Sequence, residues 1–384
     1  MSSRSRLHER LSPLLQSFKD NGPPGCACTV VRRGEVLYQE TMGYANLENE
    51  RLIAPDTLYR IYSMTKVVTC AAALILFERG LYLLNDPLEE YLPEYKDLQV
   101  YRNHESGNKM ISPATGSIRV KDLFTMTSGL VYGGEQTEIE RRTQKIIGAG
   151  ITDLDTRDVA RELAQVPLAF DPGTHWRYGT SHDVLAALIE TLSGQRFGAF
   201  LQKEIFDPLG MSDTSFKIRQ DQQGRLCTLY DRGDDGSLKS NDRLDGFYQP
   251  ECKFESGGFG LISTIGDYSR FAQALAGAGK LDGERILSPK TVQLMGTNHL
   301  SLQQLKEFNN PGYGYGLGVR VMIDPAAGGI NGSVGEFGWA GLAGTYLLID
   351  PKEELSVVYM QQMMPSMEQY IHPRLRAVIY GALD

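Results

Sequence analysis

The sequence predicts an α+β fold whose antiparallel sheet is assembled from both ends of the chain. Near the N-terminus, residues 27–45 alternate β-branched and polar side chains around a turn at residues 33–35, as a β-hairpin does. Residues 343–363 contain two further strand-like runs, which are joined at residues 351–353. The pattern between the two ends is helical. We therefore expect one sheet flanked by helices, with a mainly helical insertion between its two halves.

The spacing of apolar residues predicts where the helices lie. A surface helix is expected at the N-terminus, and a last helix at the C-terminus with Pro373 near its first turn. Internal helices are expected at residues 120–126, 156–164, 183–192, 197–205 and 267–276. Residues 1–85 and 311–384 then form a discontinuous sheet domain, and residues 86–310 form the mainly helical domain. We expect the active site between these two domains.

Composition limits the classes of partner. The chain of 384 residues is 41% hydrophobic and 22% charged, which is typical of a globular protein. Its formal net charge of -8, without any basic run, argues against a nucleic-acid partner and against an anionic membrane surface. The longest apolar run, near residues 67–77, is too short for a membrane span, and the N-terminal segment does not have the pattern of a signal peptide. We expect a cytoplasmic protein that acts on a small molecule.

The five cysteines are odd in number and scattered, which indicates reduced and mostly buried thiols rather than a disulfide framework. Cys26 and Cys28 stand close together, but they lie in a strand-like run. The sequence has no cluster of histidines or cysteines elsewhere that would complete a metal site with them. The sequence therefore implies neither a metal nor an organic cofactor, and it leaves the oligomeric state open.

Ser63 and Lys66 stand three residues apart at the start of an alanine- and leucine-rich run, which predicts a helix over residues 64–79. Side chains at this spacing share a helix face, so the lysine nitrogen can reach the serine hydroxyl. A serine becomes a nucleophile when a neighbour takes its proton, and a lysine can do so if burial lowers its pKa enough to leave it partly neutral. In the alternative interpretation, Ser63 caps the helix and Lys66 extends its amine to solvent.

The spacing alone does not decide between these interpretations. Ser106 and Lys109 have the same spacing in a polar loop with no predicted helix behind it, and nothing there suggests catalysis. The residues around Ser63 must therefore provide the distinction.

Seven segments of the sequence, which occur in a characteristic order, distinguish between the two interpretations of Ser63. They are "TLYRIYSMTK" (57–66), "LLNDPLEEYLPEY" (83–95), "IRVKDLFTMTSGL" (118–130), "FDPGTHWRYGTSHDVLAALIETLSG" (170–194), "IFDPLGMSDTSF" (205–216), "SGGFGLISTIGDYSRFAQAL" (256–275) and "GWAGLAGTYLLIDP" (338–351). With them the chain resembles the serine hydrolases that include class C β-lactamases, D-alanyl-D-alanine peptidases and family VIII carboxylesterases. The resemblance covers roughly residues 25–384. It implies a β-lactamase/transpeptidase-like fold with Ser63 as the nucleophile.

In that family a tyrosine from a Tyr-x-Asn motif completes the site, and by position Tyr178 is its counterpart. The resemblance implies that Tyr178 and Lys66 together shuttle the proton of Ser63. The literal string Tyr44-Ala45-Asn46 occurs in the predicted N-terminal hairpin, ahead of the nucleophile. We interpret that string as structural.

One departure from the family's motifs follows directly after Tyr178. Thr180 stands where β-lactamases and peptidases have asparagine, so a hydroxyl replaces an amide that both donates and accepts. Either Ser181 or His182 compensates for this loss, or Ser181 caps the following helix and His182 is a polar residue at its start. The sequence leaves these alternatives open.

A second departure lies in the third motif, where Trp339-Ala340-Gly341 replaces the common Lys-Thr-Gly, as several esterase members also have tryptophan there. Loss of the lysine removes a cation that holds a substrate carboxylate, and tryptophan provides an apolar wall instead. We expect these three residues to line the substrate pocket together with Thr180 and Ser181. The alternative is that Trp339 is a core residue.

The resemblance also implies an oxyanion hole formed by the backbone N–H groups of Ser63 and Leu342. We therefore expect a serine hydrolase that forms an acyl-enzyme on Ser63, and specifically a carboxylesterase for small or apolar esters. A β-lactamase, a D-amino-acid peptidase or amidase, and an acyltransferase are alternatives that use the same site. A catalytically silent binding protein on the same fold is the alternative from a different class.

Overall fold

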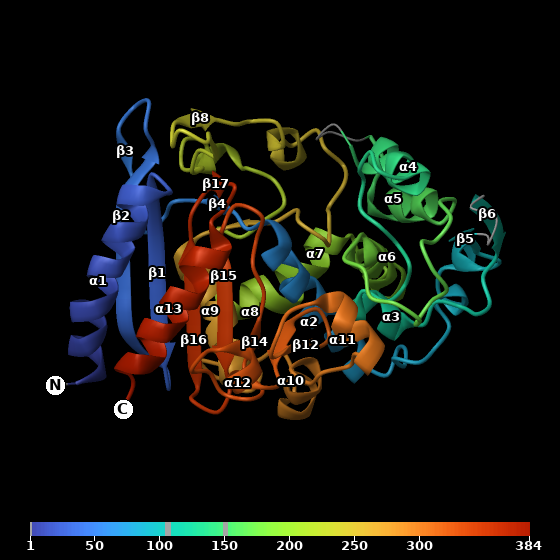
Figure 1. The fold of residues 1–384 in the computed structure, drawn as a ribbon. Coiled ribbons are helices and arrows are strands. Elements are labelled where there is room, and N and C mark those ends of the chain that lie inside the picture. Colours follow the sequence, from blue (N-terminus) through green and yellow to red (C-terminus); the bar gives the residue numbers. More distant parts are fainter. Residues whose placement is uncertain (1, 104–108, 149–152) are drawn as a thin grey trace.

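The sheet is built from both chain ends, as the sequence predicts (Figure 1). The computed structural model describes residues 2–103, 109–148 and 153–384. Eight antiparallel strands follow the order β12-β13-β14-β15-β16-β1-β2-β3. Their bounds are β1 Gly25–Arg32, β2 Glu35–Asn46, β3 Arg51–Leu52, β12 Tyr313–Tyr315, β13 Arg320–Met322, β14 Phe337–Gly338, β15 Tyr346–Asp350 and β16 Leu355–Met360.

The two halves of the sheet meet where β1 pairs with β16, from Ala27 opposite Met360 to Arg32 opposite Leu355. The predicted N-terminal hairpin is confirmed, because β1 and β2 pair across the turn formed by Arg33 and Gly34. Both turn residues have positive φ, +53° and +75°, which is the conformation of a type I′ hairpin turn.

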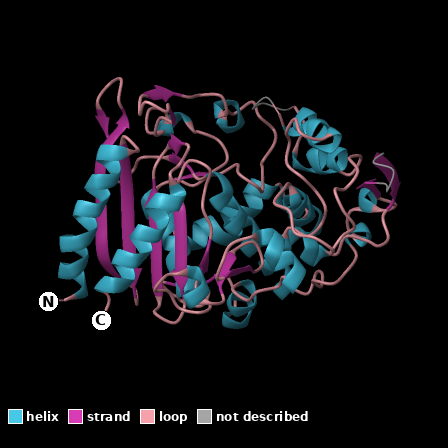
Figure 2. Ribbon diagram, in the orientation of Figure 1, coloured by secondary structure: helices cyan, strands magenta, loops and turns pink. Residues whose placement is uncertain are grey.

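Helices cover both faces of the sheet (Figures 1 and 2). The helices α1 (Ser3–Asn21) and α13 (Glu368–Ala382) pack against one face, and α9 (Ile265–Ala276) packs against the other. The side chains of β1 alternate between these two layers, since Cys26 and Cys28 face α1 while Ala27 belongs to the core on the other side. Helix α13 begins at Glu368, about one turn earlier than Pro373 predicts.

The middle of the chain is mainly helical, and the five predicted internal helices are present. The helices are α2 Thr65–Glu78, α3 Val120–Thr125, α4 Glu138–Ile147, α5 Thr156–Leu163, α6 Ser181–Ser193, α7 Phe197–Leu201, α8 Asp207–Leu209, α10 Pro289–Met295, α11 Leu302–Phe308 and α12 Pro325–Gly328. Helix α6 ends at Gly194, whose φ of +68° allows the left-handed cap. Helices α2 and α6 contact each other in the core of this region.

Short strands pair outside the main sheet. They are β4 Tyr59–Arg60 with β9 Ile262–Ser263, β5 Gln99–Asn103 with β6 Lys109–Pro113, β10 Lys280–Leu281 with β11 Glu284–Arg285, and β7 Tyr230–Arg232 between β8 Leu238–Ser240 and β17 Met363–Met364. Within the described residues, none of the helices has both the length and the apolar character needed to cross a bilayer. Residues 106–108 of the second Ser-x-x-Lys copy lie outside the described residues.

The proposed domain boundaries at residues 85 and 310 stay a prediction. Helix α9 falls within the predicted helical domain by sequence, yet it packs against β15 and β16 of the sheet. The two predicted domains therefore contact each other through α9 and the sheet, and not only through the segments that connect them.

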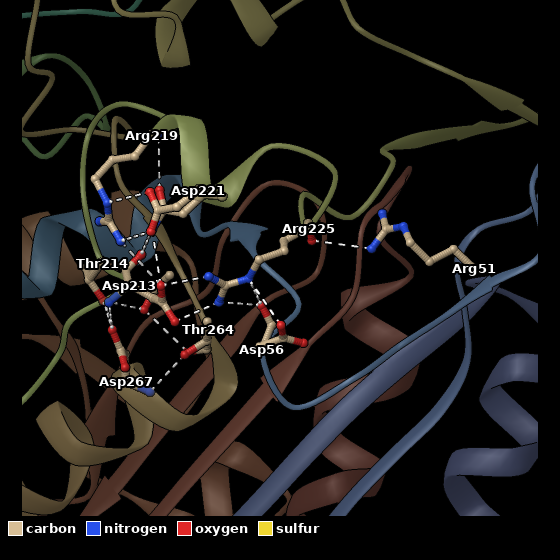
Figure 3. Close-up of polar contacts among 11 residues, drawn as sticks. Arg51, Asp56, Asp213, Thr214, Arg219, Asp221, Arg225, Thr264 and Asp267 are labelled. Carbon is tan, nitrogen blue, oxygen red and sulfur yellow. Dashed lines mark hydrogen bonds and ion pairs between the residues drawn. The ribbon is translucent and has the colours of Figure 1, made fainter.

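A charged cluster ties residues 213–225 to the segment that leads into β4 (Figure 3). The guanidinium of Arg225 donates to both carboxylate oxygens of Asp213, at 2.9 and 2.6 Å, and to the Asp56 carbonyl. These hydrogen bonds from Arg225 lower the pKa of Asp213. The Leu58 N–H donates to the Arg225 carbonyl at 3.0 Å, so the same loop continues the contact up to β4. A partly exposed pair of this kind contributes at most about 1 kcal/mol, so its main effect is positional.

Candidate active site

Ser63 lies on a short turn between β4 and helix α2. Residues Tyr62–Met64 form a single 3-10 turn, and Tyr62 has a φ of +43°. A non-glycine residue in the left-handed region costs about 1 kcal/mol or more, and such strain concentrates at functional sites. The first residue of α2 is Thr65, and its N-cap Met64 makes no side-chain capping bond. Ser63 is therefore not the cap of this helix.

Lys66 is fully buried, and its amine binds three partners. The Nζ atom donates to Ser63 Oγ at 3.2 Å, to Tyr132 Oη at 2.7 Å and to the Gly258 carbonyl at 2.6 Å. An ammonium has three donors, so all of them are used. The alternative in which Lys66 extends to solvent is wrong.

The charge of Lys66 follows from its neighbours. Burial lowers the pKa of this amine, but Tyr132 and Tyr178 raise it by more, so that its pKa lies above the usual value. Burial has the opposite effect on Tyr132, because it raises the pKa of that phenol, and the positive charge of Lys66 opposes the rise. The direction of the Lys66 shift favours the charged amine over the partly neutral lysine considered from the sequence.

Tyr178 lies against the same amine. The Lys66 nitrogen is 4.7 Å from the centre of the Tyr178 ring, which is within cation–π range. The indole Nε1–H of Trp339 donates to Tyr178 Oη at 2.9 Å. The structure thus brings Ser63, Lys66 and Tyr178 together. The literal string Tyr44-Ala45-Asn46 lies in β2, where the Asn46 amide donates to Thr228 Oγ1.

Tyr132 is a site residue that our sequence analysis missed. It lies two residues beyond the segment ending at Leu130, in a loop without periodicity, and its ring contacts that of Tyr178 edge to face at 5.5 Å between centroids. The Gly258 carbonyl was missed for a different reason: the residue lies within the segment 256–275, but a backbone acceptor has no residue-type signature. The family segments indicated the part of the chain near the site but not these two contacts.

Asp183 holds the loop that carries the Gly258 carbonyl. Its buried carboxylate accepts from Ser256 Oγ at 2.5 Å and from the Gly258 N–H at 3.1 Å. Thr69, one helical turn after Lys66, donates to the Gly257 carbonyl at 2.8 Å. A Cβ at Gly258 would lie 2.9 Å from the Asp183 carboxylate, so this close packing favours glycine. Helices α2 and α6 therefore fix the acceptor on which Lys66 depends.

The structure corrects the predictions for the residues after Tyr178. Thr180 is the N-cap of α6, and its hydroxyl donates to the Val131 carbonyl at 3.3 Å. Ser181 shares a hydrogen bond with Ser128 and is fully buried. Neither side chain lines a cavity at the site, so both are removed from the predicted pocket, and Ser181 is not the helix cap.

His182 also does not replace the missing asparagine. Its Nε2 lies 3.3 Å from the Phe124 carbonyl and 3.5 Å from Cys70 Sγ, in the core. Burial lowers the pKa of His182 to about 3, so the imidazole is neutral. The indole of Trp339 is instead the group that binds the Tyr178 oxygen.

The third motif approaches the nucleophile through Gly341. A Cβ at this position would lie 2.4 Å from the Ile61 carbonyl and 2.2 Å from Thr345 Oγ1, so glycine is required. This approach places Leu342, whose N–H has no backbone acceptor among the described residues, at the site beside Ser63. The two N–H groups of the predicted oxyanion hole thus belong to residues that line the same cavities.

Two cavities open at Ser63, and we call them the large chamber and the small chamber. The large chamber has a volume of about 840 Å³ and the small chamber about 490 Å³, which are sizes typical of small-molecule sites. Ser63, Tyr178 and Leu342 line both. The small chamber is otherwise mainly apolar and includes Tyr62, Tyr132, Ile147, Leu244, Phe247 and Phe259. The large chamber includes Trp339, Ala340, Gly341, Tyr313, Arg320 and Arg376.

Comparison with known proteins identifies the family of this chain. Residues 11–380 match the family model described as Beta-lactamase. The chain belongs to the Beta-lactamase family. Within it, Protein Rv1367c of Mycobacterium tuberculosis is 33% identical over 354 residues, which cover 89% of this chain and 86% of that protein. Esterase EstB of Burkholderia gladioli is 28% identical over 362 residues, which cover 90% of this chain and 87% of EstB.

The fold is shared with solved structures of the same type. EstCE1, described as a hydrolase with promiscuous acyltransferase activity, has a TM-score of 0.85 at 24% identity over 98% of this chain and 99% of its own. The β-lactamase/transpeptidase-like fold expected from the resemblance is therefore confirmed. Membership of the Beta-lactamase family, with these relatives, assigns the chain to the serine hydrolases and acyl-transferring enzymes of this fold.

Proposed function

We propose that this protein is a carboxylesterase that forms an acyl-enzyme on Ser63. The observation that carries the proposal is the buried Lys66 ammonium, which joins Ser63 Oγ, Tyr132 Oη and the Gly258 carbonyl in one hydrogen-bonded unit. A serine used only for packing or capping needs no such partner. The contact with Tyr178 adds a second titratable group to the same unit.

The proposed reaction has two halves. Tyr178, as a phenolate, takes the proton of Ser63 Oγ while that oxygen attacks the ester carbonyl, and the resulting phenol gives the proton to the oxygen of the leaving alcohol. Water repeats the sequence in the second half and releases the acid. The Lys66 ammonium stays charged throughout and stabilises whichever oxygen of the Ser63 and Tyr178 pair is anionic. The N–H groups of Ser63 and Leu342 stabilise the oxyanion that forms in each half.

The third motif supports an ester rather than a lactam or peptide as substrate. Trp339 stands in place of the lysine, and its N–H binds the Tyr178 oxygen, so the motif contributes no cation there. The small chamber offers an apolar lining for an acyl group. The relationship to Esterase EstB, 28% identical over 90% of this chain, favours the same substrate class.

Acyl transfer is the second candidate function. The large chamber is big enough for an acceptor other than water, and it opens directly at Ser63 and Tyr178. An acyl-enzyme with such an acceptor in place yields a new ester in place of the free acid. Adding small alcohols or amines during turnover, and assaying for new acyl products, separates transfer from hydrolysis.

The experiment that tests the proposal is a substrate panel run with a matched variant. Purified wild-type protein and Ser63→Ala are assayed with p-nitrophenyl butanoate, a chromogenic cephalosporin and a D-alanyl-D-alanine peptide. We expect turnover of the ester by the wild type, weaker turnover of the other two, and no turnover by Ser63→Ala. Equal ester turnover by both proteins would remove Ser63 from the mechanism, and a preference for the cephalosporin or the peptide would replace the esterase assignment.

Loss of all turnover would favour a silent binding protein, and a second probe decides that case. A fluorophosphonate reacts with an activated serine without needing the right substrate. We expect it to label Ser63 in the wild type and to leave Ser63→Ala unlabelled. An unlabelled wild type would show that the serine is not activated.

A further inference from the structure

The two chambers at Ser63 share Tyr178 but differ in their other aromatic residues. Tyr132 lines the small chamber and not the large one, while Trp339 lines the large chamber and not the small one. Tyr178 Oη accepts from the Trp339 N–H, so the oxygen that protonates the leaving group lies beside a wall of the large chamber. In the proposed reaction, the C–O bond of the ester breaks and that proton goes to the departing oxygen. The alcohol therefore leaves into the large chamber, and the acyl group occupies the small one.

Arg320, on β13, forms part of the large chamber's wall and is 9% exposed. Within the described residues, its one side-chain hydrogen bond runs from Nη2 to Tyr346 Oη at 2.9 Å. The rings of Tyr313 and Tyr346 lie 5.4 and 5.0 Å from its Cζ atom and cover the faces of the guanidinium. A guanidinium has five N–H donors, so several remain for a ligand.

The buried carboxylates near Arg320 leave its donors unused. Glu336 is bonded to Arg376 and lies 3.8 Å from Arg320, and a second buried carboxylate, Asp350, is joined to Glu336 through the Tyr380 hydroxyl. Arg376 is further bonded to Tyr313. Neither carboxylate makes a hydrogen bond with Arg320 among the described residues, so the remaining N–H donors of Arg320 stay unused.

Two further titratable groups of this chamber are His372 and Glu368. Burial lowers the pKa of His372 to about 3, so that imidazole is neutral. Burial raises the pKa of Glu368 and the charge of Arg320 lowers it, so this carboxylate interacts with Arg320, but it makes no hydrogen bond with it among the described residues. A buried guanidinium with unused donors gains from a ligand that accepts from them.

We propose that Arg320 binds an anionic group, such as a carboxylate, on the alcohol part of the substrate. The inference rests on the proposed esterase or acyl-transfer function of Ser63. It changes the expected substrate class, because the alcohol half is then bulky and charged while the acyl half is apolar. A guanidinium can bind a carboxylate through two parallel N–H···O bonds, so Arg320 supplies an acid-binding group that the third motif lacks.

The test uses two esters that share acyl group, leaving phenol and size. These are the butanoyl esters of 3-(4-hydroxyphenyl)propanoic acid and of its primary amide. We expect the wild type to prefer the acid by about tenfold to a hundredfold in kcat/KM, mostly through KM. The ratio of kcat/KM values for acid and amide should fall to about one in Arg320→Met. It should be intermediate in Arg320→Lys, which keeps the positive charge but not the paired N–H donors of the guanidinium. Arg374→Met removes an exposed guanidinium from α13 outside the chamber and should keep the wild-type preference.

Equal kcat/KM values for the two esters in the wild type would overturn the inference, as would an unchanged preference in Arg320→Met. Folding of each variant is checked by its thermal unfolding. If Arg320→Met does not fold, the wild-type preference and its reduction in Arg320→Lys decide the question.

A binding arm separates this inference from the proposed function. Calorimetry compares 3-(4-hydroxyphenyl)propanoate with its amide as ligands of the wild type and of Arg320→Met, and it needs no turnover. Preferential binding of the acid that Arg320→Met abolishes supports the anion site even if no ester is cleaved. Equal binding of acid and amide by the wild type contradicts the site even if esters are cleaved.

The assignment of the chambers has its own matched pair of variants. Ile330→Trp narrows the large chamber and Leu244→Trp narrows the small one, and both positions are partly buried aliphatic residues. We expect Ile330→Trp to discriminate against large alcohols and Leu244→Trp against long acyl chains, each by about tenfold in kcat/KM. The reverse pattern would exchange the two chambers.

Discussion

Lys66 and Arg320, two of the buried cations at this active site, differ in how completely the protein uses their N–H donors. Among the described residues, Lys66 gives all three of its ammonium donors to Ser63, Tyr132 and Gly258, whereas the Arg320 side chain gives one hydrogen bond, to Tyr346. A cation whose donors are saturated is fixed in place and acts on its neighbours, while one with unused donors is available to a ligand. The comparison separates the catalytic centre from a recognition site.

The largest effect is expected when the saturated cation is removed. Lys66→Met removes the charge and leaves the Gly258 carbonyl and the Tyr132 hydroxyl without their donor. We expect kcat for p-nitrophenyl butanoate to fall by about 10³- to 10⁴-fold. Lys290→Met, which changes an exposed lysine on α10, is the control and should retain wild-type kcat. Retention of more than a tenth of the activity in Lys66→Met would mean that the cation is not part of the mechanism.

The two tyrosines that contact Lys66 provide a second test. Tyr178→Phe removes the oxygen that exchanges protons with Ser63, and we expect a loss of about 10²- to 10⁴-fold in kcat. Tyr132→Phe removes a hydrogen bond to the lysine without removing the proton shuttle, so its loss should be smaller, about tenfold. Steady-state kinetics of the two variants show which of them loses more kcat. A larger loss in Tyr132→Phe would transfer the role of the base to Tyr132.

Trp339 connects the two cations, since it binds the Tyr178 oxygen and lines the chamber that contains Arg320. Trp339→Phe keeps an aromatic wall but loses the N–H donor, and we expect kcat to fall by about tenfold. Trp176→Phe is a matched control, because the buried Trp176 Nε1 has no hydrogen-bond partner among the described residues. Equal losses in the two variants would show that the ring, and not its N–H group, is what matters at Trp339.

The smallest effect concerns stability at acid pH, because each cation has a neutral histidine beside it. Burial, together with the charge of Lys66 beside His182 and the charges of Arg320 and Arg376 beside His372, lowers the pKa of both histidines to about 3. Their usual pKa is 6.5, so the unfolded chain gains these protons first as the pH falls. The stability from each neutral histidine is fully present above pH 6.5 and is lost as the pH falls towards 3.

Replacing one of these histidines should lessen that loss. We expect the free energy of unfolding of His182→Gln to fall less steeply with acidification than that of the wild type, by at most about 1.4 kcal/mol per pH unit. Denaturant titrations at a series of pH values measure the slope. Parallel wild-type and variant curves would show that His182 does not contribute to the acid sensitivity.

Helices and strands whose apolar side chains recur at a regular spacing could be predicted from the sequence. The apolar spacing of Leu7, Leu11 and Leu15 gave α1, and the alternation around Arg33 and Gly34 gave the hairpin of β1 and β2. The bounds were less accurate where tertiary contacts set them. Helix α13, for example, begins at Glu368, before the turn that contains Pro373.

The residues of the site were predictable only where a motif names them. Ser63, Lys66 and Tyr178 came from ordered segments, but Tyr132 and Arg320 lie outside any recognised spacing, and only the folded chain brings them to the site. Thr180 and Ser181 show the opposite error. Their sequence position next to Tyr178 suggested the pocket, yet the start of α6 turns both side chains into the core.

The formation of an acyl-enzyme on Ser63 is the central claim, and intact-protein mass spectrometry tests it most directly. The wild type is mixed with p-nitrophenyl butanoate, quenched in acid during turnover and then digested for peptide mapping. We predict the mass of one butanoyl group on the peptide that contains Ser63, and no added mass in Ser63→Ala. A butanoyl group on another residue, or turnover without any acylated protein at times when product is forming, would contradict this account.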